Sequence, residues 1–421
     1  MDNRHVEDKT RGLLKRIFVG YGLVVGFMVF LLFPNISFNR EDVSIRENRR
    51  LAQFPAPSNL LSLGLSRWCG QFGAAFEDRF FGRNALMDLH DTVKTAFDDR
   101  GNDHVLIGLE GWMYLRSTLL DYANVAGIDE DAYVLLRDKV KAIASYARRR
   151  GKTFVFFIVP DKCRVYPEYV RFQKKLRPDT ESHTERLVAR LRHDCDFPII
   201  YPRDEFVCQA RKMARPIYYR DDTHWTDEGA YFGYLKTIEA IMRERKSGDA
   251  PRKLELGNGD WEAFQHPVGD LARMLQRDKS ALDPQEYGRA VFTEGGISRK
   301  RLDQRPPLHS QTVATCAKGS LRLFCMGDSF SDKLPKFLER SFSDSFFKHV
   351  RDGIHKDDLS RLEASDVVLM EVVERNLCDV GQMSMHGKVA QSSESNRKGK
   401  VSRLRTAPKG KKDRGRKRKG K

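Results

Sequence analysis

Continuous apolar runs that follow amphipathic segments recur along the middle and the C-terminal part of the chain. The run 153–159 reads T-F-V-F-F-I-V, and related runs cover 321–326 and 366–373. Such runs are typical of strands buried on both faces of a parallel sheet. The segment 131–150 has the spacing of an amphipathic helix and is followed by Gly151, a natural helix stop. Helix, glycine and buried strand in this order predict an α/β fold with a mostly parallel central sheet.

Three helices are predicted in more detail. The helix over 131–150 places these apolar residues on one side: Val134, Leu135, Val140, Ile143 and Ala147. A second helix is expected to be capped by Thr226, and its apolar positions fall three and four apart: Tyr231, Tyr234, Leu235, Ile238, Ile241 and Met242. The segment 60–83 carries four aromatic residues at helical spacing, which we expect in the core: Phe72, Phe76, Phe80 and Phe81.

Two parts of the chain lack this regularity. Residues 247–320 are polar and broken by Gly and Pro, with a helix predicted only over 268–275. We interpret this part as an insertion that contributes to the rim of a site. From Gly387 onward the chain turns to Ser, Gly, Lys and Arg, which predicts disorder because little apolar surface offsets the ordering entropy.

The N-terminal region contains seventeen uncharged apolar residues, 17–33, with basic residues on both sides. No small-x-small cleavage motif follows directly, so an uncleaved membrane anchor is favoured over a signal peptide, and a buried core helix is the remaining alternative. The positive-inside bias is weak. The predicted organisation is a cytoplasmic tail at 1–16, an anchor at 17–33, a linker at 34–59, an enzyme-like domain at 60–386 and a basic tail at 387–421.

The distribution of charge and the spacing of the cysteines argue against two kinds of site, a nucleic-acid groove and a cysteine metal site. The net charge is +17, and residues 396–421 hold fourteen Lys and Arg against the single acid Asp413. This tail is either a solvated extension without function or a segment that binds anionic polymers or lipid headgroups through its positive charge. It lacks the interleaved aromatics of a nucleic-acid groove, so no specific nucleic acid is expected. The seven cysteines form no C-x-x-C pair, which argues against a cysteine metal site. Cys195 and Cys208 are the closest pair, but the sequence leaves their pairing open.

The candidate chemistry lies in two short stretches. Asp222 and His224 are two residues apart, so in an extended segment a carboxylate can hold an imidazole. Ser329 follows the apolar run 321–326 within G-D-S-F-S-D, where it would be exposed at a strand end. A serine becomes nucleophilic when a base takes its proton and a carboxylate orients the base. Asp221 is the rival orienter, but the D-x-H spacing favours Asp222.

These motifs resemble those of the SGNH hydrolase-like proteins of the alginate O-acetyltransferase type, represented by AlgJ and AlgX. The similar stretches extend from the anchor to about residue 380: E-N-R-R-L-A-Q-F-P (47–55), F-E-D-R-F-F-G-R-N-A-L (76–86), I-V-P-D-K-C-R-V-Y-P-E (158–168), D-D-T-H-W-T-D-E-G-A (221–230), G-D-S-F-S-D (327–332) and E-V-V-E-R-N-L (371–377). Ordinary SGNH hydrolases place G-D-S before the Asp/His pair. The resemblance therefore implies a circularly permuted, flavodoxin-like SGNH sandwich that lies outside the cytoplasm and O-acetylates a polysaccharide.

The resemblance also implies roles for single residues. Ser329 resembles the nucleophile, His224 the base and Asp222 its orienter, with the Ser329 backbone N–H as one oxyanion donor. Arg375 and Asn376 are candidates for a second donor, although Arg375 could instead pair with Glu374 or Glu371. The remaining side chains are considered for the substrate cleft: Lys162, at a strand end, and Trp225, either a sugar platform or a residue wedged against the following helix.

Three functions compete at this point. The leading hypothesis is acetyl transfer through a serine ester, without cofactor or metal, onto a polysaccharide acceptor. The resemblance implies that a membrane-bound O-acyltransferase supplies the acetyl group across the inner membrane to a periplasmic site. An esterase or deacetylase would use the same residues with water as the acceptor. A catalytically silent polysaccharide-binding scaffold of an export complex is the alternative from another class.

Overall fold

The structure is a computed structural model that describes residues 41–44, 49–80, 83–84, 87, 101–125, 127–171, 181–245, 248–277, 284–293, 295–302, 309 and 311–391. The predicted anchor at 17–33 and the basic segment 396–421 lie outside the described residues. Among the described residues, no helix combines the length and apolar character needed to cross a membrane. The chain divides into two compact units, residues 1–107 with 270–282 and residues 108–269 with 283–421.

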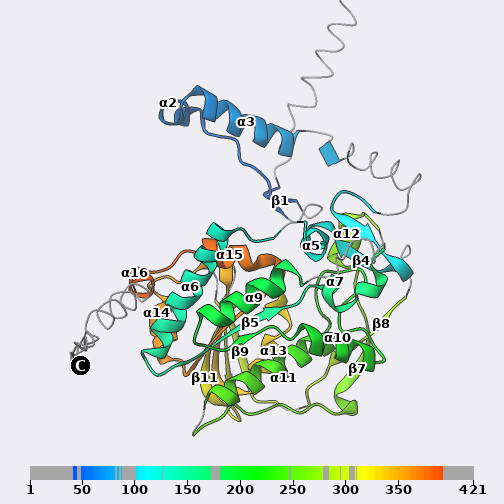
Figure 1. Cartoon of the computed structure of the whole chain (residues 1–421), viewed down its shortest axis with the longest axis vertical. Coiled ribbons are helices and arrows are strands. Elements are labelled where there is room, and N and C mark those ends of the chain that lie inside the picture. The colour runs from blue at the N-terminus through cyan, green and yellow to red at the C-terminus, as the bar shows by residue number, and fades with distance from the viewer. Residues whose placement is uncertain are drawn as a thin grey trace, which may run out of the picture. The chain divides into compact units, whose positions relative to one another are not determined.

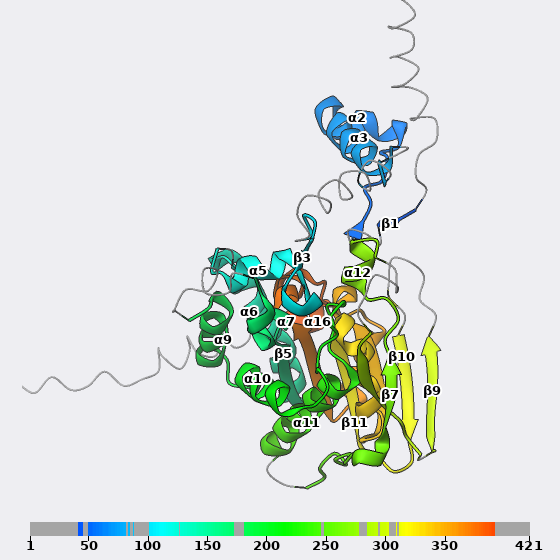
Figure 2. The same cartoon turned by 90° about the vertical axis from the view of Figure 1, so that its right-hand side faces the viewer.

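The larger unit is built on a seven-stranded sheet in the order β6-β5-β13-β11-β12-β10-β9. Its strands are β5 (Thr153–Val159), β6 (Ile199–Ile200), β9 (Ile297–Leu302), β10 (Gln311–Cys316), β11 (Ser320–Gly327), β12 (Phe342–His349) and β13 (Val367–Val373). Neighbours from β6 to β12 are parallel, and β10 and β9 join antiparallel at one edge (Figure 2). The predicted α/β fold with a mostly parallel sheet is confirmed.

Helices and short elements surround this sheet (Figure 1). The helices of the larger unit are α5 (Arg116–Tyr122), α6 (Glu130–Arg148), α7 (Lys162–Val165), α9 (His183–Asp194), α10 (Arg203–Lys212), α11 (Asp227–Glu244), α13 (Pro335–Leu338), α14 (Asp358–Ala364), α15 (Leu377–Gln382) and α16 (Gly387–Ala390). The remaining strands of this unit are β4 (Met113–Leu115), β7 (Trp261–Gln265) and β8 (Glu286–Ala290), of which β7 and β8 pair antiparallel. Because α16 is helical and buries Val389, the ordered chain extends beyond the predicted boundary at 387.

The core lies on both faces of the sheet, as the side chains of β5 show. Phe154, Phe156 and Ile158 alternate along the strand and belong to one buried cluster with residues of α6 and α9. The opposite face carries Phe157, whose ring centroid is 6.3 Å from that of Trp225. A Cβ at Gly233 of α11 would lie 2.8 Å from the Trp225 ring. Helices therefore cover both faces, which explains why β5 is apolar at every position.

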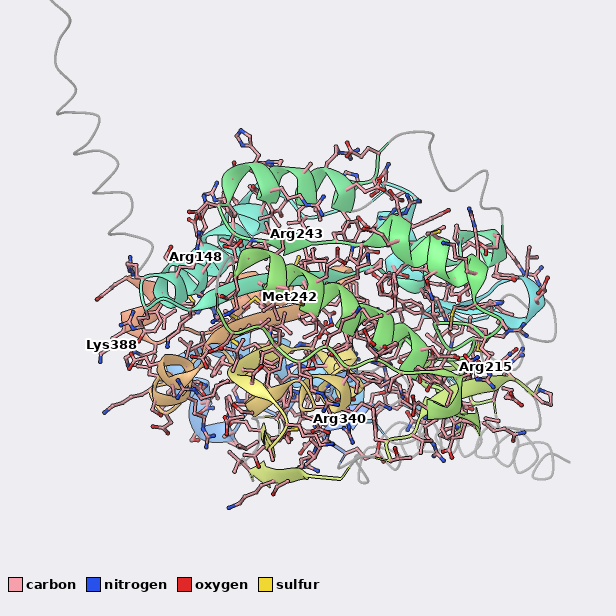
Figure 3. All side chains as sticks on the ribbon, turned by 90° about the horizontal axis from the view of Figure 1, so that it is seen from below. Arg148, Arg215, Met242, Arg243, Arg340 and Lys388 are labelled. Carbon is pink, nitrogen blue, oxygen red and sulfur yellow. The ribbon has the colours of Figure 1, made fainter. Side chains whose placement is uncertain are left out.

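Most predicted elements are present with small shifts in their ends. The buried strand 153–159 matches β5, and α6 and α11 match two predicted helices, with the Thr226 hydroxyl accepting from Gly229 N–H as the cap. Two residues assigned to apolar faces are in fact exposed, Leu135 at 51 % and Met242 at 44 %. Met242 lies beside Arg243 near the C-terminal end of α11 (Figure 3), whereas the preceding Ile241 is buried.

The interpretation of residues 247–320 as mostly irregular is wrong in part. This stretch supplies β9 and β10 to the central sheet and the pair β7 and β8. The edge strand β9 includes the exposed residues Arg299, Lys300 and Arg301, so it lacks the apolar alternation by which a strand is recognised. A polar edge strand gives almost no hydrophobic signal, which is why the pattern missed it.

The smaller unit contains β1 (Val43–Ser44), β2 (Arg49–Arg50), α2 (Leu60–Leu63), α3 (Leu65–Arg79), β3 (Val105–Ile107) and α12 (Asp270–Met274). The helix predicted over 60–83 is broken at Gly64, which has a positive φ of 76°. Phe72 is 39 % exposed, so its assignment to the core is wrong, and Phe81 lies outside the described residues. Bonds of 2.8 and 2.6 Å join the Arg49 guanidinium to Asp78 and lower the pKa of Asp78 to about 2.

Candidate active site

Two loops at the carboxyl ends of the parallel strands hold the candidate residues. Ser329 opens the short 3₁₀ helix η7 (Ser329–Asp332), directly after Asp328 and the end of β11. Asp222 and His224 lie in the irregular segment that precedes α11. The ends of parallel strands are where α/β sheets bind ligands, because the connecting loops leave a crevice there.

Three side chains form a continuous hydrogen-bonded chain. His224 Nδ1 lies 2.6 Å from Asp222 Oδ1, and His224 Nε2 lies 2.9 Å from Ser329 Oγ. A carboxylate can only accept, so the proton of a neutral His224 resides on Nδ1. The Nε2 lone pair then faces the Ser329 hydroxyl, which is the tautomer that a general base requires. The structure therefore brings Asp222, His224 and Ser329 together, and their catalytic roles stay predictions.

Asp221 is the rival orienter, and its carboxylate has a different partner. Its Oδ2 accepts from the backbone N–H of Gly269 at 2.7 Å. In contrast, Asp222 Oδ1 accepts from both the ring and the backbone N–H of His224, the latter at 2.9 Å. The geometry assigns the imidazole to Asp222, as the D-x-H spacing predicts.

The nucleophile turn is held by Asp328. Its Oδ1 accepts from Phe330 N–H at 3.0 Å, which closes the turn around Ser329. Its Oδ2 accepts from Val373 N–H and from the Asn376 side chain, both at 2.9 Å, and so ties the turn to the end of β13. Asp328 is buried, and donors satisfy both of its oxygens, which is what a buried carboxylate requires.

A second acid lies beneath the same turn. The Ser331 hydroxyl donates to Oε2 of Glu371, a fully buried residue of β13. Within the described part of the chain, Oε1 of Glu371 has no hydrogen-bond partner. Burial, reinforced by the charge of Asp328, raises the pKa of Glu371 well above its usual range. The raised pKa favours the protonated form of Glu371 in the folded chain.

Lys162 was expected to line the substrate cleft, but the structure buries it. It is 4 % exposed, and its ammonium donates to the carbonyl oxygens of Tyr219, Arg220 and Asp222 at 3.0, 3.0 and 2.7 Å. These carbonyls belong to the segment that carries His224 and have turned inward, where an unpaired carbonyl would be costly. Lys162 thus stabilises the segment that carries Asp222 and His224.

Trp225 is fully buried, which excludes the sugar-platform interpretation and fits the alternative of a wedged ring. Its indole N–H donates to the carbonyl of Phe330 at 3.0 Å. Its ring also packs edge-on against the Phe330 ring, with centroids 5.3 Å apart. Trp225 therefore connects the Asp-His segment to the nucleophile turn.

The two predicted oxyanion donors both have acidic partners. Arg375 pairs with Asp161, at the end of β5, so the ion pair expected with Glu374 or Glu371 is replaced by one with a different acid. The Asn376 amide donates to Asp328, as described above. One amide nitrogen carries two N–H groups, so this contact leaves one for another acceptor.

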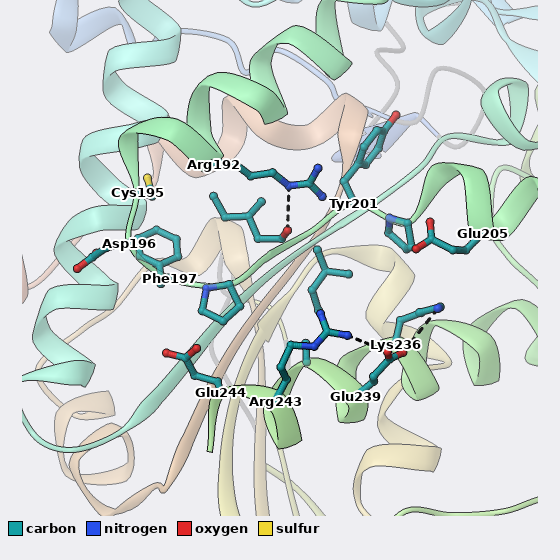
Figure 4. Close-up of a pocket in the computed structure, with 15 residues that line it drawn as sticks. Arg192, Cys195, Asp196, Phe197, Tyr201, Glu205, Lys236, Glu239, Arg243 and Glu244 are labelled. Carbon is teal, nitrogen blue, oxygen red and sulfur yellow. Dashed lines mark hydrogen bonds and ion pairs between the residues drawn. The ribbon is translucent and has the colours of Figure 1, made fainter. Parts of the chain in front are cut away.

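A hollow of about 490 Å³ lies away from these residues, at the β6 edge of the sheet between α9 and α11 (Figure 4). Its charged side chains are mixed in sign and partly paired, with Arg243 donating to Glu239 at 2.8 Å and Arg192 to the Ile199 carbonyl at 3.3 Å. None of the predicted site residues lines it. The hollow is therefore not part of the candidate active site.

The residues that support the site are only weakly indicated by the sequence. Asp328 belongs to the G-D-S motif, but its role as a clamp was not predicted. Glu371 stands out as an acid inside the apolar run 366–373. Both contacts join residues forty or more positions apart, so local patterns do not reveal them. All seven cysteines have free thiols, and no pair is formed by Cys195 and Cys208.

Comparisons with known proteins found several similar chains. A probable alginate O-acetylase AlgJ of Pseudomonas putida is 25 % identical over 208 residues, 48 % of this chain and 49 % of that protein. Its counterpart in Pseudomonas syringae pv. tomato is 23 % identical over 264 residues, 62 % and 59 % of the two chains. The matches thus span about half the length of these relatives. The solved O-acetyltransferase domain of Pseudomonas putida AlgJ is 18 % identical, with a TM-score of 0.46 over 69 % of this chain and 99 % of that domain.

The family assignment rests on a match of greater extent. Residues 105–362 match the model of the SGNH hydrolase-like domain of acetyltransferase AlgX. The matched region covers more than half of the chain and includes Asp222, His224 and Ser329. The chain therefore belongs to the AlgX family of SGNH hydrolase-like domains.

Proposed function

We propose that this protein is an O-acetyltransferase that moves an acetyl group through a Ser329 ester onto a hydroxyl of a polysaccharide. The observation that carries the proposal is the chain of hydrogen bonds from Asp222 through His224 to Ser329, at 2.6 and 2.9 Å. The family match and the relatives named as alginate O-acetylases support the choice of reaction and acceptor. Because Asp222 and His224 precede Ser329, the proposed fold is a circular permutation of the usual SGNH order.

The first half-reaction forms the acetyl-enzyme. Ser329 Oγ attacks the carbonyl carbon of an acetyl donor while its proton passes to His224 Nε2, and Asp222 stabilises the resulting imidazolium. The tetrahedral oxyanion would be stabilised by the Ser329 backbone N–H, with the second N–H of Asn376 as a further donor. Collapse of the intermediate breaks the bond to the leaving group, which takes the proton from His224.

The second half-reaction transfers the acetyl group. His224 takes the proton of a sugar hydroxyl, whose oxygen attacks the ester carbonyl, and Ser329 leaves with that proton returned through Nε2. An esterase would run the same steps with water in place of the sugar. A catalytically silent scaffold would not need the hydrogen bonds that join Asp222, His224 and Ser329. These hydrogen bonds do not identify the acceptor.

Substitution of Ser329 tests this proposal in the full chain. With p-nitrophenyl acetate as donor, we expect Ser329→Ala to lower kcat/KM by about 10⁴-fold, as for other triad nucleophiles, with an unchanged melting temperature. Adding an oligosaccharide should increase donor turnover and yield an acetylated sugar. Release of acetate that sugars do not alter would favour the esterase, and residual Ser329→Ala activity within tenfold of the parent would remove the serine from its role.

The partner and the location are part of the same proposal. Acetyl-CoA is cytoplasmic, so a periplasmic site needs an acetyl group handed across the inner membrane, for which a membrane-bound O-acyltransferase is the proposed donor. An anchor at 17–33 would raise the local concentration of the site beside that donor. A reporter fused after residue 390 should be active only outside the cytoplasm, and cytoplasmic activity would contradict this topology.

A further inference from the structure

A second histidine lies behind the carboxylate of the candidate triad. His266 belongs to the H-P-V-G stretch 266–269 that follows β7, in the region taken from the sequence to be a rim insertion. Its side chain is 16 % exposed, and its Nε2 atom is buried without a hydrogen-bond partner among the described residues. No sequence motif singles out His266.

This nitrogen lies close to the carboxylate of the candidate triad. His266 Nε2 lies 3.5 Å from Asp222 Oδ2, the oxygen that does not hold His224. Since an ionised carboxylate has only acceptor sites, the contact is favourable when His266 carries its proton on Nε2. The carboxylate of Asp222 then has an imidazole on each of its two oxygens.

The orientation of His266 is fixed by aromatic packing. Its ring stacks on Tyr219, with centroids 3.8 Å apart and planes inclined by 16°. Tyr287 meets it edge-on, with centroids 6.2 Å apart. Both neighbours are buried, so the imidazole has little freedom to turn its Nε2 away from Asp222.

The backbone of the same stretch is attached directly to the Asp-His segment. Gly269 N–H donates to Asp221 Oδ2 at 2.7 Å. A Cβ at Gly269 would lie 2.2 Å from the Asp221 carbonyl oxygen and 2.8 Å from Asp222 Cβ. The two segments of the chain therefore approach so closely that only glycine fits at position 269. The stretch 266–269 therefore packs directly against the segment that carries both carboxylates.

We propose that His266 is a positioning residue that holds the carboxylate of Asp222 from the side opposite His224. The inference rests on the proposed function, because it is Asp222 that orients the base. His266 contacts neither Ser329 nor the predicted oxyanion donors. Its effect should therefore fall on the rate of serine acylation and leave donor binding unchanged.

Two substitutions separate the N–H group from the ring. His266→Phe keeps a flat ring for stacking on Tyr219 and removes the donor, whereas His266→Gln keeps a donor. In the full chain with p-nitrophenyl acetate, we expect His266→Phe to slow acylation about tenfold or more at unchanged KM, as for groups that orient reactive residues from behind. His266→Gln should recover most of the rate.

A double-mutant cycle distinguishes positioning from general damage. In an Asp222→Asn background the carboxylate is absent, so we expect His266→Phe to cause no further loss. An equal loss in both backgrounds, or wild-type acylation by His266→Phe, would overturn the inference. If the wild-type chain is never acetylated while Ser329 is intact, the proposed function fails instead.

The inference has a second test that needs no activity. Histidine side-chain ¹⁵N NMR of the full chain, assigned by comparison with His266→Phe, should show His266 protonated on Nε2. The Nε2 signal should shift when Asp222 is replaced by Asn. A His266 signal that is protonated only on Nδ1, or is insensitive to Asp222→Asn, would contradict the contact.

Discussion

The segment that carries His224 and the turn that carries Ser329 are stabilised by groups of opposite charge. The first turns its carbonyl groups inward and is held by a buried cation, Lys162, that contacts three of them. The second presents N–H groups and is held by a buried acid, Asp328, that accepts from Phe330 and Val373. The comparison shows how two irregular loops can be fixed without regular secondary structure.

The difference has a consequence for the chemistry. Asp328 accepts the N–H groups of Phe330 and Val373, which fixes the turn that carries Ser329 against the end of β13. A segment whose carbonyls are bound to Lys162 keeps them away from the nucleophile and leaves the imidazole to face it. Trp225 joins the two loops by donating to the Phe330 carbonyl at 3.0 Å.

Among substitutions of the groups that support the two loops, Gly327→Ala, next to the turn that carries Ser329, is expected to lower activity most. The added Cβ would lie 1.7 Å from Ser331 Oγ and 2.7 Å from Glu371 Oε2, so the turn must move. We expect acylation to fall about a hundredfold, because misplacement of a nucleophile by roughly 1 Å has that cost. Urea unfolding should show a loss of about 1–3 kcal/mol. Gly257→Ala, whose Cβ would be 3.8 Å from its nearest neighbour, is the matched control, and equal behaviour of the two would contradict the account.

An intermediate effect is expected from Lys162→Met on the histidine side. The change keeps the length of the side chain and removes a donor from three inward carbonyls, of which that of Arg220 still accepts from Met113 N–H at 2.9 Å. At about 1 kcal/mol for each of the other two contacts, the free energy of unfolding should fall by about 2 kcal/mol. Lys236→Met removes only a surface contact to Glu239 at 3.6 Å and should change stability by less than about 0.5 kcal/mol. If both lysines tolerate the change equally in urea unfolding, the inward carbonyls do not need the cation.

The smallest effect is expected from Glu371→Gln, because a protonated carboxyl and an amide present similar groups to Ser331. Activity should stay within about threefold of the parent. The pH dependence should differ: the raised pKa of Glu371 means that its contribution is fully present below its unfolded value near 4.5 and is lost as pH rises toward the folded pKa. The free energy of unfolding from pH 5 to 8 should therefore fall less steeply in Glu371→Gln, and a parallel decline in both proteins would mean that Glu371 is ionised when folded.

Much of the fold followed from apolar patterns, and the failures have physical causes. The strand β5 was predicted with its observed ends because every residue in it is buried. The polar edge strand β9 was missed because an edge exposed to water needs no apolar face. The contacts of Lys162 could not be foreseen, because they depend on carbonyl groups 57 to 60 positions away along the chain.

The candidate site was foreseen to a similar degree. The residue types and spacing of Asp222, His224 and Ser329 sufficed to group them, since few other combinations allow a base between an acid and a hydroxyl. The side chains around them were harder to interpret. Lys162 and Trp225 were candidates for the substrate cleft, with a ring wedged against the following helix as the alternative for Trp225. Both are buried, because sequence does not say which side of a loop faces the core.

Peptide mass spectrometry of the full chain after brief exposure to an activated acetyl ester tests the central claim most directly. The account predicts one added acetyl group on the peptide that contains Ser329, absent in Ser329→Ala and lost with transfer of the label when an oligosaccharide acceptor is added. An acetyl group found on other residues only, or a folded wild-type chain that takes up none, would contradict it.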